Sequence, residues 1–194
     1  MGLDIYFYKQ NKMNPEREEA LEKFNEANEA LNDFWMKNPE FDLAAHGGSI
    51  RKEYDKLEVV YNGYRSTYET LMEREKVAYF RKVNLLLPFF GYGENCSDLI
   101  ITKDQVEDLI GTCSNVLDYF SNLRELYLEK DVYTKQEWID YCQETLPNQE
   151  GFFFGGYEYD EVYLNKVEQV KKQFEEVIED VDWEKQDLVM HCWW

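Results

Sequence analysis

Hydrophobic and polar residues alternate at the start of the chain as they do in a β-strand with one buried face. Leu3 and Phe7 fall on the same face as the apolar residue between them, whereas Asp4 and Tyr6 fall on the other face. The last residues, 188–194, are again rich in strand-forming side chains. This propensity predicts that the C-terminal segment pairs with the N-terminal strand.

Between these ends, apolar residues recur at three- and four-residue spacing, the period of an amphipathic helix. Helix-start signals come from side chains that bond free backbone N–H groups: Asn14 before a proline, Thr102 and Thr134 as capping boxes, and Asp160 before the last stripe. The helices that we expect cover residues 14–37 and 49–72 and follow Thr102, Thr134 and Asp160. The apolar stripe of the last one includes Val162.

These patterns predict an α+β fold that is predominantly helical, with five or so helices. A small sheet is expected from the N-terminal strand, a central or late strand, and the C-terminal strand. The late candidate is the glycine-bracketed segment 151–157, which suits a buried strand or a tight bend. We expect a single domain over residues 1–194, with 14–72 as a helical elaboration, since 194 residues can bury a sizeable core.

The chain is strongly acidic, with 40 Asp and Glu against 21 Lys and Arg and a formal net charge of −19. Such a surface repels phosphate backbones and anionic lipids, so we expect no direct nucleic-acid partner and no membrane partner. A protein with a basic surface is the natural partner. The alternative is that the excess acid only keeps an aromatic-rich protein soluble.

No membrane span or secretion signal is visible, because the longest apolar run, 85–90, is far below the ~20 residues that a span needs. We therefore expect a cytoplasmic protein, and the four scattered cysteines are expected to be reduced thiols. Cys113 and Cys142 fall in helical patterns and are interpreted as small buried hydrophobes. His191 and Cys192 are neighbours that point to opposite faces of a strand, so a shared metal is disfavoured. We expect no cofactor.

Two small clusters carry possible chemistry. Arg81 and Lys82 follow the aromatic pair at 79–80, so a planar base could stack on a ring while the cations take a phosphate. The alternative is that Arg81 pairs with Glu158 or Asp160 to hold two segments together. Those late carboxylates could also bind a divalent cation, although acids at a helix start serve equally as caps. The loop at 39–48 holds His46, which we interpret as solvent-exposed and not catalytic.

Three segments resemble a family of small uncharacterised bacteriophage and bacterial proteins. The family has a Met-Gly-Leu-Asp start, a central Tyr-Trp-Arg-Lys-Ala-Asn segment and a late Gly-Phe-Phe-Phe-Gly segment followed by Glu-Tyr-Asp. The matching segments here are residues 2–6, 79–84, 146–147 and 151–161. This chain departs from the pattern at Leu87, where the family has His, and at Val162, where it has Trp. The resemblance implies a phage or mobile-element origin and the host cytoplasm as location.

Three hypotheses follow. The first is a non-catalytic phage or mobile-element accessory or anti-defence protein that binds and inhibits a host protein through an acidic, tyrosine-rich surface. The second is a binding module for a small nucleotide-like ligand held between the first strand, Arg81 and the turn at 157–160. The third is a metal-dependent hydrolase that uses the late carboxylates. The residues expected at the ligand site are Asp4, Tyr6, Tyr79, Arg81, Lys82, Asn84, Tyr157, Glu158, Tyr159 and Asp160.

Overall fold

A computed structural model describes residues 2–42, 48–71, 73–128, 131–152 and 154–194. The fold is α+β and predominantly helical, as the sequence predicts, with six α-helices in the described residues and a four-stranded antiparallel sheet. The chain divides into two compact units, residues 11–73 and the rest (residues 1–10 and 74–194). This division does not test the prediction of a single domain. His46 lies outside the described residues.

The larger unit holds the sheet, whose strand order is β2-β1-β4-β3. The strands are β1 (Asp4–Asn11), β2 (Arg74–Arg81), β3 (Asp98–Ile101) and β4 (Gln186–Trp193). The predicted pairing of the C-terminal strand with the N-terminal strand is confirmed, because β4 is hydrogen-bonded to β1. The sequence analysis left β3 unassigned.

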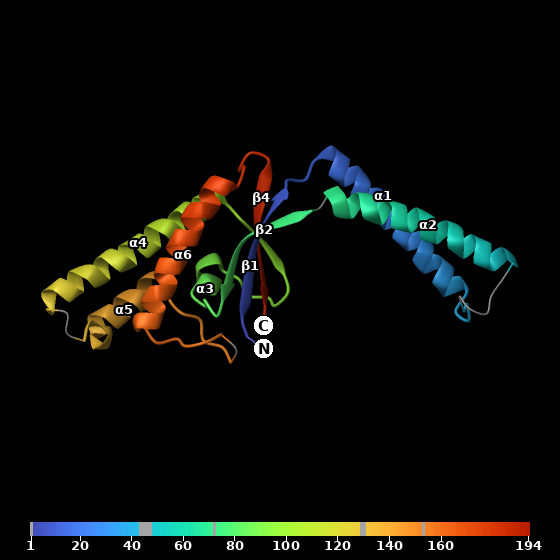
Figure 1. Cartoon of the computed structure of the whole chain (residues 1–194). Helices are drawn as coiled ribbons and strands as arrows, with labels where there is room; N and C mark the ends of the chain where they lie inside the picture. The colour runs from blue at the N-terminus through green and yellow to red at the C-terminus, as the bar shows by residue number, and fades with distance from the viewer. Residues whose placement is uncertain (1, 43–47, 72, 129–130, 153) are drawn as a thin grey trace. The chain divides into compact units, whose positions relative to one another are not determined.

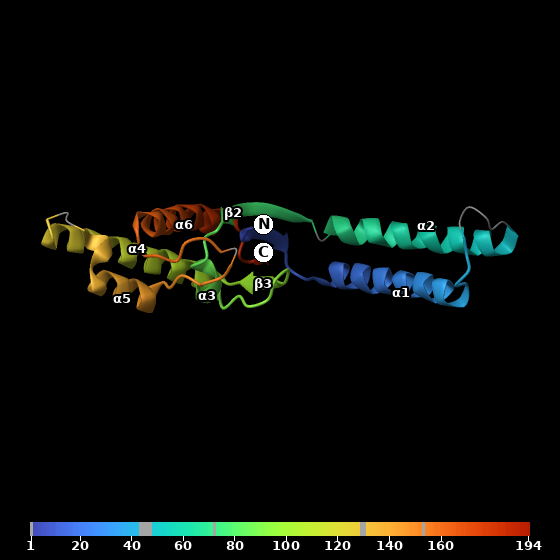
Figure 2. The ribbon, with the colours of Figure 1, turned by 90° about the horizontal axis from the view of Figure 1, so that it is seen from below.

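Helices cover one face of this sheet (Figure 1). They are α3 (Leu86–Phe90), α4 (Lys103–Leu126), α5 (Gln136–Thr145) and α6 (Glu161–Asp180), with a short 3₁₀ helix, η1 (Val132–Thr134). α4 packs against both α5 and α6 (Figure 2). The buried side chains of alternate strand positions, among them Leu3, Ile5 and Phe7, meet these helices in one hydrophobic core. The other face of the sheet carries Asp4, Tyr6 and their neighbours on β2.

The smaller unit is a hairpin of two long helices, α1 (Pro15–Lys37) and α2 (Gly48–Leu71). The Asn14 side chain accepts a hydrogen bond from the Arg17 N–H at 2.9 Å, which confirms the predicted cap. Aromatic rings form much of the contact between the helices: Phe24 stacks on Tyr68 with ring centroids 5.3 Å apart. Part of the tyrosine stripe of α2 therefore packs against α1 as the core of this unit.

Two local predictions fail, and the structure distinguishes between two alternatives at a third position. Thr134 does not cap α5, because its N–H and hydroxyl both bond the Asp131 carbonyl oxygen in η1, and Lys135 stands at the N-cap with no side-chain bond. The described residues of the segment 151–157 form the tight bend and not the buried strand: the Phe154 N–H donates a hydrogen bond to the Gly151 carbonyl oxygen, and Phe152 is 95% exposed. Val162 is 58% exposed, because the buried stripe of α6 begins one residue later.

The cysteines provide a direct test of this packing. Cys113, Cys142 and Cys192 are fully buried, and burial raises the pKa of each thiol to about 12, whereas Cys96 is exposed. We expect iodoacetamide at neutral pH to modify Cys96 alone in the native protein and all four thiols after denaturation, because the thiolate is the reactive form. Mass spectrometry counts the labels. Rapid native labelling of a second thiol would contradict the buried positions.

Candidate functional site

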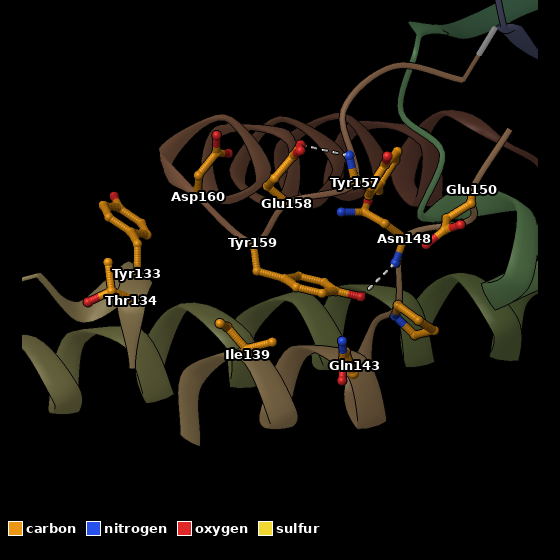
Figure 3. Close-up of a pocket in the computed structure, with 11 residues that line it drawn as sticks. Tyr133, Thr134, Ile139, Gln143, Asn148, Glu150, Tyr157, Glu158, Tyr159 and Asp160 are labelled. Atoms are coloured by element: carbon orange, nitrogen blue, oxygen red, sulfur yellow. Dashed lines mark hydrogen bonds between the residues drawn. The ribbon is translucent and has the colours of Figure 1, made fainter. Parts of the chain in front are cut away.

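An open cleft of about 650 Å³ lies between η1, α5 and the loop that leads into α6 (Figure 3). This volume is in the range of small-molecule and side-chain binding sites. We call it the acidic cleft. Its lining residues are Tyr133, Thr134, Ile139, Gln143, Pro147, Asn148, Glu150, Tyr157, Glu158, Tyr159 and Asp160. Figure 3 shows Glu158 and Asp160 on one side, Ile139 and Gln143 on the other, and the Tyr159 ring between them.

Two hydrogen bonds hold Tyr159 in place, one at its backbone and one at its side chain. Its carbonyl oxygen accepts a hydrogen bond from the Trp138 indole N–H at 2.6 Å, and its hydroxyl oxygen accepts one from the Asn148 backbone N–H at 3.2 Å. The ring also packs edge-on against Tyr163, 4.9 Å between centroids. Trp138 and Tyr163 are buried core residues, so the centre of the acidic cleft is anchored to the hydrophobic core.

The rings of Tyr133 and Tyr159 are neutral near physiological pH. Burial raises the pKa of the Tyr159 hydroxyl, and burial together with the charge of Glu161 raises that of Tyr133. The three carboxylates, Glu150, Glu158 and Asp160, are exposed. None of the 11 lining residues is Lys, Arg or His. The acidic cleft therefore combines neutral aromatic surface with negative charge, the two features that favour an organic cation.

One amide in the acidic cleft has unused hydrogen-bonding capacity. Both side-chain polar atoms of Asn148 are inaccessible to solvent and have no hydrogen-bond partner in the described part of the chain. A buried amide without partners costs free energy, which a ligand with donors and acceptors would recover. Nearby, fully buried Asn84 donates to the Gln149 carbonyl oxygen at 2.8 Å and helps to fix the loop.

The late carboxylates have identifiable structural partners. Asp160 caps α6 by accepting hydrogen bonds from the Val162 and Tyr163 N–H groups at 2.9 and 3.1 Å, as predicted. Glu158 accepts from the Tyr157 N–H at 3.1 Å. Within the described ranges, no group of three or more His, Cys, Asp or Glu side chains is placed to hold a metal ion. The hydrolase hypothesis stays a prediction.

The structure separates the sequence-predicted site residues into two groups. Tyr157, Glu158, Tyr159 and Asp160 line the acidic cleft. The predicted site residues on the strands occupy the face of the sheet that the helices leave uncovered. On this face Asp4 lies opposite Arg81, and Tyr6 lies opposite Tyr79. Lys82 lies against the loop that leads into α6, because its β-carbon is 3.1 Å from where a β-carbon on Gly155 would stand.

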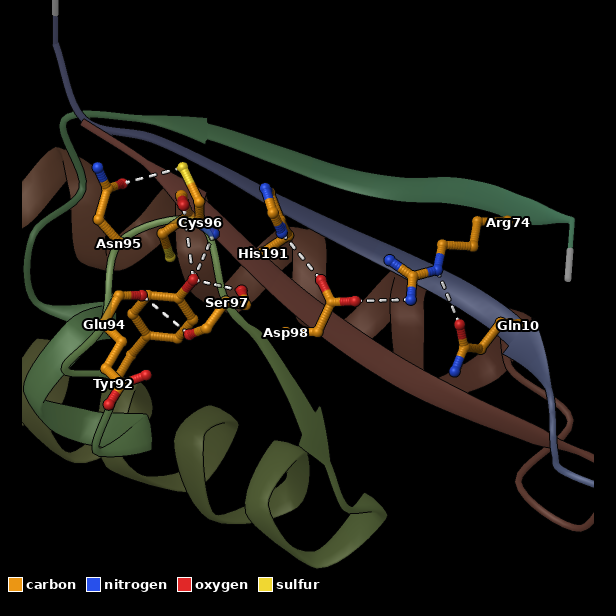
Figure 4. Close-up of polar contacts among 10 residues, drawn as sticks. Gln10, Arg74, Tyr92, Glu94, Asn95, Cys96, Ser97, Asp98 and His191 are labelled. Carbon is orange, nitrogen blue, oxygen red and sulfur yellow. Dashed lines mark hydrogen bonds and ion pairs between the residues drawn. The ribbon is translucent and has the colours of Figure 1, made fainter. Parts of the chain in front are cut away.

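On the uncovered sheet face, the Tyr79 hydroxyl donates a hydrogen bond of 2.5 Å to the Asp4 carboxylate, which is 9% exposed. Further along the same face, Arg74 bonds Gln10 at 2.8 Å and Asp98 at 2.6 Å, and His191 contacts the other oxygen of Asp98 at 2.9 Å (Figure 4). Burial alone would raise the pKa of Asp98, but the hydrogen bonds from Arg74 and His191 outweigh it and hold the pKa below its ordinary value.

Seven cleft residues were not foreseen: Tyr133, Thr134, Ile139, Gln143, Pro147, Asn148 and Glu150. No local signal marks them, because they become neighbours only when the loop before α6 folds back over α5. No protein-family model matches the chain, and no curated protein or solved structure matches it. Among the described residues, no helix is both long and apolar enough to cross a membrane.

Proposed function

We propose that this protein acts by binding, and that the acidic cleft receives a lysine or arginine side chain of a partner protein. The observation that carries the proposal is the composition of the lining: three tyrosines, three carboxylates and no basic residue. A guanidinium stacks on tyrosine rings and forms charge-assisted hydrogen bonds to carboxylates. The Asn148 amide, which has no hydrogen-bond partner in the described residues, belongs to the same lining.

The charge of the whole chain supports the same partner. A formal net charge of −19 attracts a basic surface over a distance of about 8 Å at physiological salt and increases the association rate. The proposal includes the role expected from the sequence, a phage or mobile-element accessory protein that inhibits a host protein. The phage or mobile-element origin rests on the resemblance alone.

A labelled arginine–glycine peptide tests the acidic cleft. We expect the triple variant Glu150→Gln, Glu158→Gln, Asp160→Asn to bind the peptide at least tenfold more weakly than the wild type. Each charge-assisted hydrogen bond is worth about 1.5–3 kcal/mol. Asn at position 160 still caps α6, so the fold is preserved. Fluorescence anisotropy gives the dissociation constants.

The matched control removes the same charge elsewhere. Glu22, Glu26 and Glu29 are exposed on α1, and their replacement by Gln changes the net charge equally without touching the acidic cleft. We expect this control to bind almost as tightly as the wild type. An equal loss of affinity in both triple variants would show that only the overall charge matters and would refute the cleft as the binding site.

A further inference from the structure

Two adjacent cations at the end of β2 have no acidic partner among the residues that the structure describes. In the described ranges, the side chains of Arg81 and Lys82 form no hydrogen bond and no ion pair, and both residues are exposed. Arg74, at the other end of the same strand, is bonded to Gln10 and Asp98 (Figure 4). In a chain with a net charge of −19, two neighbouring cations without a partner call for a physical explanation.

The carboxylates that the sequence offers as partners are engaged elsewhere. Asp160 caps α6 and Glu158 accepts from a backbone N–H. Both also stabilise the charge of half-buried Lys166, whose pKa is lowered by burial and by the like charge of Lys82. Asp4, directly across from Arg81, accepts the Tyr79 hydroxyl. The alternative in which Arg81 pairs with Glu158 or Asp160 is therefore not what the structure contains.

The backbone at Lys82 brings the side chains of Arg81 and Lys82 together beside Gly2. Lys82 has a φ of 56°, a left-handed conformation that is strained for a non-glycine residue. Its side chain passes Gly155 and reaches Gly2, where Lys82 Cε and Arg81 Nη2 lie 3.3 and 3.6 Å from the position of a glycine β-carbon. Any side chain at position 2 would crowd this approach.

Aromatic rings lie beside Arg81 on the same face of the sheet. Tyr79, two residues before Arg81, is 37% exposed, and its ring centroid lies 5.0 Å from that of Tyr6. Tyr6 stacks in turn on Tyr8 at 6.1 Å. Two positions apart on one strand face corresponds to about 7 Å, a spacing that a nucleoside monophosphate can span from base to phosphate. Exposed tyrosine rings are suitable surfaces for base stacking.

We propose that Arg81 and Lys82 bind the phosphate group of a small nucleotide whose base stacks on Tyr79. The site is separate from the acidic cleft and does not depend on the function proposed for it. The guanidinium supplies two parallel donors to phosphate oxygens, and the ammonium supplies a third contact. The ligand is a single nucleotide, because a chain with a net charge of −19 repels a longer phosphate chain.

Titration calorimetry with the four nucleoside 5′-monophosphates, inorganic phosphate and adenosine tests this site. We expect at least one monophosphate to bind more tightly than either inorganic phosphate or adenosine. The double variant Arg81→Gln, Lys82→Gln should bind it at least tenfold more weakly. Tyr79→Leu should weaken binding of the nucleotide and leave the affinity for inorganic phosphate unchanged. Both altered sites are on the surface, and circular dichroism confirms that the variants fold.

The control variant Lys52→Gln, Lys56→Gln removes the same charge from exposed positions on α2 and should bind like the wild type. The proposal is overturned if no monophosphate binds at millimolar concentration, or if the two double variants lose equal affinity. Binding of inorganic phosphate as tight as that of every nucleotide would also overturn it, and so would tighter binding of an oligonucleotide.

Discussion

Replacing Phe174 with alanine is expected to lower the free energy of unfolding by about 3–5 kcal/mol. Phe174 is fully buried on α6, and its ring meets those of Phe7, Phe80 and Phe90 with centroids 4.9, 5.8 and 6.1 Å apart. The substitution therefore leaves a cavity where α6 packs on β1 and β2. Guanidinium-induced unfolding, followed by circular dichroism, measures the loss.

Phe152→Ala is the matched control, because it removes the same side chain from a position that is 95% exposed. Little apolar surface is buried there, so we expect a change within about 0.5 kcal/mol. A loss at Phe152 as large as that at Phe174 would contradict the turn geometry. A loss below about 1 kcal/mol at Phe174 would contradict the aromatic centre of the core.

The elements with strong local signals were predictable from the sequence. Asn14 and Asp160 cap their helices because a short polar side chain before an apolar stripe has one favourable arrangement. Thr102 forms the full capping box with Gln105. Thr134 carries the same signal but belongs to η1, where its hydroxyl donates a hydrogen bond to the Asp131 carbonyl oxygen. A tertiary turn with a closer partner therefore overrode an identical local pattern.

The acidic cleft was only half predictable. Tyr157, Glu158, Tyr159 and Asp160 stand out because they surround a helix start, but the opposite wall comes from η1 and α5, which no short pattern connects to them. Phe152 and Phe154 are the same residue type in the same short segment, but the sequence does not show which of them is buried. Phe152 is exposed, whereas Phe154 is 6% exposed. Sequence spacing identified the residues on one side of the site and left their partners to the three-dimensional fold.

Two glycines constrain the backbone of the loop that leads into α6. A β-carbon on Gly151 would lie 2.5 Å from the Phe154 ring, closer than any real contact. Gly155 has a φ of +98°, which side chains rarely adopt, and faces the Lys82 β-carbon. The glycines that bracket the three phenylalanines thus place the loop against Lys82 and position the residues that follow it in the acidic cleft.

Gly155→Ala is expected to destabilise the protein by about 1–3 kcal/mol, because the left-handed backbone and the close approach to Lys82 both oppose a β-carbon. Gly111→Ala provides a control of opposite sign: Gly111 lies inside α4 with nothing within 4 Å of a β-carbon, so alanine should stabilise the helix by about 0.5–1 kcal/mol. Thermal and denaturant unfolding measure both changes. Since the Gly155 variant also displaces the loop, it should weaken binding of the arginine–glycine peptide, whereas Gly111→Ala should not. Unchanged stability and unchanged peptide binding in Gly155→Ala would show that the loop is not held by this contact.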